Sequence, residues 1–103
     1  MENLYKLLYK IKENPTLYLR KKTLSLLDTF VGGYTIAQIE PDKRCRYALA
    51  RSQFQKFVEE KYEYKGVQSW HRLIDFYCLS NDDAAFDEFY KLLDEFLKDK
   101  ETQ

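Results

Sequence analysis

Apolar residues recur at helical spacing along nearly the whole chain, and this periodicity limits its fold more than any other feature. The best stripe lies in the last third and contains Phe86, Phe89, Tyr90, Leu93, Phe96 and Leu97. Intervals of three and four residues bring side chains onto one face of an α-helix. No segment alternates between apolar and polar residues for long enough to demand a β-strand. The periodicity therefore predicts an all-α fold.

We expect one compact domain of about five helices, because 103 residues do not supply two independent cores. The first helix carries the stripe from Leu4 to Ile11 and ends at Asn14, since the residue before Pro15 is pushed out of the helical region. The segment 41–47 is expected to be a loop, or a loop that leads into a short helical turn. Two further helices are expected from near Thr23 to near Glu40 and from about Ala50 to Tyr62. A fourth carries Trp70, Leu73, Ile74 and Tyr77, and the last starts at the Ser80–Asp83 signal and carries the stripe from Phe86 to Leu97.

Two of these helix starts have a side-chain signature. Thr23 is a typical N-cap residue. The run from Ser80 to Asp83 combines a capping side chain with acidic residues in the first turn, where the positive end of the helix dipole favours them. We therefore expect helices to begin at both places.

Two glycines, Gly32 and Gly33, interrupt the apolar stripe of the second expected helix. Each costs a helix interior about 0.5–1 kcal/mol relative to alanine. They do not form a phosphate loop, because no strand precedes them and no Lys-Ser/Thr pair follows. We expect them to let another helix approach closely or to permit a bend.

Charge is balanced over the chain but distributed unevenly along it. Seventeen Lys and Arg residues match seventeen Asp and Glu residues, whereas residues 1–52 carry a net charge of +5 and residues 53–103 carry −5. A nucleic-acid-binding protein is normally basic, so we expect no nucleic-acid partner. The two halves either cancel each other in the folded protein or form a polar surface that steers a charged partner.

The chain has no signature of secretion, membrane insertion or a disulfide framework. Cys45 and Cys78 stand outside any C-x-x-C motif, and the N-terminus lacks the apolar core of a signal peptide. No run approaches the ~18 apolar residues of a membrane span. We therefore expect a cytoplasmic protein with reduced thiols and no membrane contact.

No combination of residues indicates an enzyme or a metal centre. His71 is the single histidine, and Cys78 lies about 10 Å from it along one helix, too far for nucleophile activation. Asp83 and Asp87 are spaced like carboxylate metal ligands, yet no Glu-x-x-His motif accompanies them. We expect no catalytic residue, no metal and no cofactor, and we interpret His71 as a boundary residue beside Trp70. A small enzyme that uses His71 is a minor alternative.

Aromatic residues are more numerous than a core of this size readily hides. The chain has nine Tyr, seven Phe and one Trp. Tyrosine is enriched at protein interfaces because it joins a large contact area to a hydroxyl group. The tyrosines that fall in turns or off the main stripes, and that would suit a protein partner, are Tyr5, Tyr9, Tyr47, Tyr62 and Tyr64.

Three blocks of sequence together resemble one protein family. The first contains Pro15, Tyr18, Leu19, Thr23, Leu24, Leu27, Phe30, Val31, Gly33, Tyr34 and Ala37. The second contains Phe54, Phe57, Val58, Tyr62, Ser69, Trp70, Leu73 and Ile74, and the third contains Ala85, Phe86, Asp87, Phe89, Tyr90, Leu93 and Phe96. Over most of residues 4–97 the chain resembles the small helical immunity proteins of bacterial contact-dependent growth inhibition and related polymorphic toxin systems. It departs from their pattern at Arg20-Lys21, where a glycine is expected.

The resemblance implies a cytoplasmic protein that binds the toxic C-terminal domain of a large delivered protein and blocks its active site without catalysis. Many such toxins are nucleases with basic clefts, so a nuclease is the expected partner. An acidic surface suits such a cleft and speeds capture. On the acidic second half, the candidate toxin-binding residues are Asp82, Asp83, Asp87, Glu88, Asp94, Glu95, Glu59, Glu60, Tyr62 and Glu63.

The alternative interpretation is a helical adaptor or regulatory module that binds a protein of an unrelated pathway. Both interpretations predict a binding surface in place of a catalytic centre. They differ in whether the chain protects a cell from a toxin.

Overall fold

The computed structural model describes the backbone of residues 2–38 and 44–102 and the side chains of residues 4–37 and 53–99. Within these ranges the chain forms helices and no strand, which confirms the predicted all-α fold. The helices are α1 (Glu2–Glu13), α2 (Pro15–Tyr18), α3 (Leu24–Gln38), α4 (Arg44–Lys61), α5 (Trp70–Tyr77) and α6 (Asp82–Thr102).

The five longer helices correspond to the predicted ones, and the structure differs from the prediction in one additional short helix and in the start of α4. The single-turn helix α2 is absent from the prediction; Pro15 occupies its first position, where a missing N–H costs nothing. Helix α4 begins at Arg44, so the prediction of a start near Ala50 is wrong; the helical backbone over 44–47 excludes a loop throughout that segment and leaves the alternative of a loop that leads into a helical turn. Arg, Ala and Leu favour helix in that stretch. Pro41 and the rest of the expected loop lie outside the described residues.

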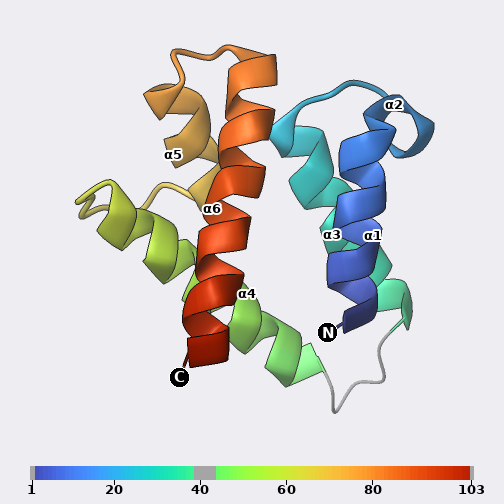
Figure 1. The fold of residues 1–103 in the computed structure, drawn as a ribbon, viewed down its shortest axis with the longest axis horizontal. Coiled ribbons are helices and arrows are strands. Elements are labelled where there is room, and N and C mark those ends of the chain that lie inside the picture. Colours follow the sequence, from blue (N-terminus) through green and yellow to red (C-terminus); the bar gives the residue numbers. More distant parts are fainter. Residues whose placement is uncertain (1, 39–43, 103) are drawn as a thin grey trace.

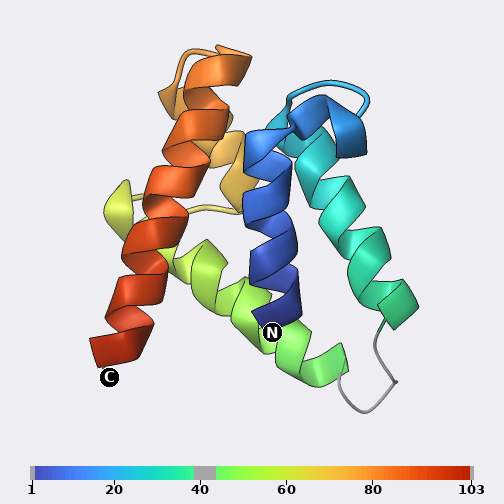
Figure 2. The ribbon, with the colours of Figure 1, turned by 45° about the vertical axis from the view of Figure 1, so that its right-hand side comes forward.

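Helix α6 is the centre of the fold. It contacts α3, α4 and α5, and α1 lies between α6 and α3 in Figure 2. Helix α4 crosses behind α6, and α5 lies beside the upper half of α6 (Figure 1). The Tyr90 hydroxyl of α6 donates a hydrogen bond of 2.6 Å to the Leu8 carbonyl of α1. Every other long helix therefore packs around α6.

The core is built from the predicted apolar stripes. On α6, Phe86, Phe89, Tyr90, Leu93 and Phe96 are buried, which confirms the stripe read from the sequence. Fully burying one side chain of this size stabilises a fold by about 1.5–3 kcal/mol. The largest fully buried side chains come from α1, α3, α4, α5 and α6, and they are Tyr90, Phe86, Ile11, Leu24, Leu27, Ile74, Leu92 and Val58.

Side-chain caps begin α3 and α6 at the two predicted places. Thr23 Oγ1 accepts a hydrogen bond of 3.2 Å from the Leu26 N–H. Asn81 Oδ1 accepts one of 2.9 Å from the Ala84 N–H. Each bond satisfies an N–H group that has no partner inside its helix. Both predicted helix starts are confirmed.

The glycines Gly32 and Gly33 do not mark a close contact between helices. A Cβ atom added to either residue would meet nothing within 4 Å among the described residues. The prediction that another helix approaches closely at this point is therefore wrong for the described part of the chain. Both glycines have negative φ angles, so the helical backbone itself does not require them.

Replacing Gly33 by alanine is expected to raise the free energy of unfolding by about 0.5–1 kcal/mol, because the unfolded chain loses freedom and no side chain is displaced. Urea denaturation followed by circular dichroism measures this. The control is Gly66→Ala, whose Cβ would collide with the Tyr64 ring and should destabilise the protein. A loss of stability in Gly33→Ala would contradict the prediction.

Candidate protein interface

The carboxylates predicted as toxin-binding residues on α6 divide between its two flanks. One flank faces α1 and the connection between α2 and α3. There Asp83 Oδ1 lies 3.3 Å from Lys22 Nζ, and Asp94 accepts a hydrogen bond from the Tyr9 hydroxyl. Two of the candidate acids are therefore engaged by neighbouring elements on this side.

The second flank faces α4 and holds Glu88 and Glu95. Glu95 Oε2 lies 2.8 Å from Lys61 Nζ. Tyr62 stacks on Tyr77, with ring centroids 4.3 Å apart and ring planes 17° apart. Burial and then the charge of Glu88 raise the pKa of Tyr62, whose hydroxyl is buried with no hydrogen-bond partner among the described residues. The fold thus brings Tyr62 and Glu88 together.

The remaining candidate acids are spread over the surface. Glu59 accepts a hydrogen bond of 2.9 Å from Gln55 Nε2, whereas Glu60 and Glu63 are exposed near the end of α4. Asp82 is exposed at the start of α6.

A shallow groove beside α1 and α6 carries charges of both signs. Its lining alternates three lysines with three carboxylates: Lys12, Asp87, Tyr90, Lys91, Asp94, Glu95 and Lys98. Lys12 Nζ also lies 5.5 Å from the centre of the Tyr90 ring. A basic cleft would meet lysines as well as acids here, so the outer surface of α6 is not a continuous anionic strip.

The turn between α5 and α6 exposes three large apolar side chains, which we call the apolar corner: Phe76, Tyr77 and Leu79. Their exposed fractions are 83% for Phe76, 63% for Tyr77 and 89% for Leu79. The corner lies at the end of α6 opposite the C-terminus (Figures 1 and 2). The predicted stripe from Trp70 to Tyr77 excludes Phe76, and this is the sequence signal that could have found the corner.

The backbone of the apolar corner is a Schellman turn. The Leu79 N–H donates to the Phe76 carbonyl at 3.1 Å, and the Ser80 N–H donates to the Asp75 carbonyl at 2.8 Å. Leu79 has a φ angle of 55° and Ser80 one of 60°. Glycine is the usual residue at the first of these positions, because a Cβ atom is strained in the left-handed region. Leu79 therefore has a backbone conformation that is unfavourable for a residue with a side chain.

Two carboxylates lie beside the apolar corner. Burial raises the pKa of Asp75, and the negative charge of Asp82 raises it further, whereas His71 lowers it. The Oδ1 atom of Asp75 is buried and has no hydrogen-bond partner among the described residues. Because the negative charges of Asp75 and Asp82 lie close together, a cation is favoured at this edge of the corner.

Replacing Asp75 by asparagine is expected to raise the free energy of unfolding at pH 7. The folded protein holds the pKa of Asp75 above its unfolded value, so the ionised carboxylate destabilises the fold above that value. This penalty disappears as the pH falls through the raised pKa, so the gain should shrink between pH 7 and pH 3. Urea denaturation at both pH values tests this, with exposed Asp87→Asn as the control.

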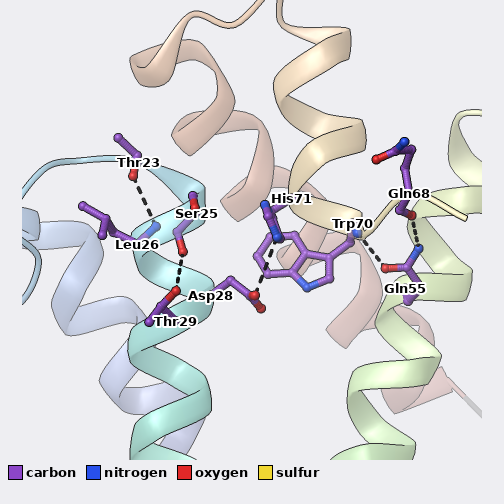
Figure 3. A network of polar contacts seen from close by, with 9 residues as sticks. All are labelled: Thr23, Ser25, Leu26, Asp28, Thr29, Gln55, Gln68, Trp70 and His71. Carbon is purple, nitrogen blue, oxygen red and sulfur yellow. Dashed lines mark hydrogen bonds and ion pairs between the residues drawn. The ribbon is translucent and has the colours of Figure 1, made fainter.

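The polar contacts around His71 serve to join helices (Figure 3). His71 Nε2 lies 3.6 Å from Asp28 Oδ2 of α3, and its ring meets Trp70 edge-on with centroids 5.6 Å apart. Gln55 of α4 accepts a 2.6 Å hydrogen bond from the Trp70 N–H and donates one of 2.9 Å to the Gln68 carbonyl. The position of His71 beside Trp70 matches the sequence interpretation, while Asp28 is a partner that the sequence does not indicate.

Most of the tyrosines that were predicted to suit a protein partner pack against the core. Tyr5, Tyr9, Tyr62 and Tyr64 are half-buried and pack against the core, and the side chain of Tyr47 lies outside the described residues. Among the described side chains, the exposed aromatic ones are Phe76 and Tyr77 at the apolar corner. Tyr77, which the stripe predicts to face the core, is one of them.

Two further features bear on cofactors and the membrane. Among the described side chains, no group of three His, Cys, Asp or Glu residues is placed to hold a metal ion. Cys78 is a free, half-buried thiol, and the side chain of Cys45 lies outside the described residues. No helix in the described part of the chain is long and apolar enough to cross a bilayer.

Comparison with known proteins adds no relative. No family model, curated protein or solved structure matches the chain. The candidate interface therefore has to be judged by its own geometry and chemistry.

Proposed function

We propose that this protein is an immunity protein, which binds a cognate bacterial toxin domain and neutralises it by stoichiometric contact. The expected toxin is a nuclease whose active site becomes blocked in the complex. Binding requires no cofactor and no chemical step on either partner. This proposal joins the resemblance of the sequence to the properties of one surface.

The apolar corner is the observation that carries the proposal. Three large side chains within four residues are mostly exposed there, although burying each would stabilise the protein. Aromatic side chains of this kind dominate the binding energy of protein interfaces. Apolar side chains that are exposed in the free protein can become buried when a partner binds.

Acidic residues support the same conclusion through a different property. Asp82 and Asp83 stand in the first turn of α6, next to the corner, and Asp87 follows one turn later. The second half of the chain carries a net charge of −5. Long-range attraction of this kind accelerates association with a basic partner, and added salt weakens it.

Co-expression tests the proposal. Where a nuclease domain is encoded immediately upstream of the gene, that domain is produced in a bacterial host with and without the protein, and growth is recorded. Rescue of growth, together with formation of a one-to-one complex by the purified proteins, is the expected result. Continued killing in the presence of soluble, folded protein would contradict an immunity function.

The adaptor interpretation predicts a different outcome. An adaptor binds its partner without protecting the cell, so binding without rescue would favour it. Replacing His71 by alanine separates the minor enzymatic alternative, because a binding protein keeps its protective activity without an imidazole at this position.

A further inference from the structure

Leu79 combines two features that each work against the stability of the free protein. Its φ angle of 55° places a bulky side chain in the left-handed region, at the Schellman position where glycine is favoured. Its side chain is also 89% exposed. Neither feature improves packing within the chain. Residues held in strained conformations cluster at functional sites, so this position points to a role outside the fold.

The backbone under Leu79 is held firmly in place. The Leu79 and Ser80 N–H groups bond to the last turn of α5, and Asn81 donates to the Cys78 carbonyl at 3.1 Å. Tyr77 stacks on the ring of Tyr62, which directly follows α4. Leu79 and Phe76 therefore project from a fixed platform. A preorganised surface loses little conformational freedom when it binds.

The edge of this platform has an excess of negative charge. Asp75 and Asp82 repel each other, and Asp75 Oδ1 is buried with no hydrogen-bond partner among the described residues. Lys22 forms its salt bridge with Asp83 on the far flank of α6. Arg72 is the exposed cation of α5, one turn before Phe76. A partner that brings Lys or Arg side chains to Asp75 and Asp82 would complement this edge.

We infer that Leu79 and Phe76 are the anchors of toxin recognition, and that they enter an apolar pocket on the toxin domain bordered by Lys or Arg side chains. The inference rests on the proposed immunity function. It places the binding energy at the apolar corner and assigns the α6 acids mainly to the association rate. The centre of the interface is therefore hydrophobic. This differs from a contact in which an acidic surface takes the place of a nucleic acid in a basic cleft.

The experiment measures binding to the purified domain that the co-expression test identifies as the toxin, inactivated at its catalytic residue. Leu79→Gly and Phe76→Ala should each weaken affinity at least about tenfold, chiefly by faster dissociation. Leu17→Ala is the matched control, since Leu17 is 74% exposed on α2, away from the corner. It should bind like the wild type. Asp82→Asn should slow association and reduce its dependence on salt.

Stability measurements separate loss of an anchor from loss of the fold. Leu79→Gly relieves the strained φ angle, so its urea midpoint should rise while its affinity falls. A variant that is more stable and binds less tightly cannot be explained by misfolding. Wild-type affinity in both Leu79→Gly and Phe76→Ala would overturn the anchor assignment and leave the immunity function intact.

Two other outcomes would also overturn the inference. If the wild-type protein neither binds the toxin domain nor rescues growth, the proposed function fails, and the anchor assignment fails with it. If sedimentation shows a dimer that Leu79→Gly dissociates, while toxin binding is unchanged, the apolar corner is a contact between two copies of this chain.

Discussion

Replacing Phe54 by alanine should lower the free energy of unfolding by about 3–5 kcal/mol, the range for truncating a buried phenylalanine. Phe54 is 8% exposed and joins α4 to both α5 and α6. Its ring centroid lies 5.4 Å from Trp70, 5.7 Å from Phe89 and 5.4 Å from Phe96, all in edge-to-face contact. Removing this ring leaves a cavity among three partners on two helices. Urea denaturation followed by circular dichroism measures the loss.

The same substitution at an exposed site is the control. Phe76→Ala removes an identical side chain from the apolar corner, where it is 83% exposed, and should change stability by no more than about 0.5 kcal/mol. The difference between the two variants isolates the value of burial. A loss below about 1 kcal/mol for Phe54→Ala would mean that the aromatic cluster is not packed as described.

Replacing Gln55 by methionine should cost about 1–3 kcal/mol, because it leaves polar backbone groups without partners. Ser69 precedes α5 but makes no side-chain cap, so Gln55 of α4 takes that role by accepting from the Trp70 N–H. The Gln55 amide also donates to the Gln68 carbonyl (Figure 3). Methionine keeps the length of the side chain and removes both of these bonds, together with the one to Glu59. The loss is measured in the same urea experiment.

Gln53→Met provides the matched control, since Gln53 lies on the exposed side of the same helix. It should alter stability by no more than about 0.5 kcal/mol. Ser69→Ala should also have little effect, because its hydroxyl makes no capping bond. If Ser69→Ala were as damaging as Gln55→Met, the cap of α5 would have been assigned to the wrong residue.

Local features of this fold could be predicted correctly from the sequence. The stripe of α6 and the caps at Thr23 and Asn81 depend on side chains within one or two turns of each other. The errors have local causes as well. Helix α2 is too short to show a helical repeat of apolar residues. Pro41 suggested a loop that extends into residues which belong to α4. The prediction of a close helix contact at the glycines of α3 was wrong for a different reason. The space around a residue depends on neighbours that are distant in the chain.

The candidate interface could be predicted only in part. Counting acids located the negative half of the chain, but their grouping depends on which flank of α6 each one occupies. Lys22 and Tyr9 reach Asp83 and Asp94 from elements more than sixty residues away in sequence. Such long-range pairs leave no local pattern. The apolar corner left one trace, the position of Phe76 off the helical stripe.

The amino-acid sequence by itself determined the all-α fold class, the buried stripe of α6 and the starts of α3 and α6, because each follows from interactions between near neighbours. Only the tertiary structure decided which acids are paired, that a Cβ atom at Gly32 or Gly33 would meet none of the described residues, and that Leu79 is both strained and exposed. Exposure and charge pairing arise when helices distant in sequence pack together. Function at a binding surface depends on that packing, whereas the fold class does not.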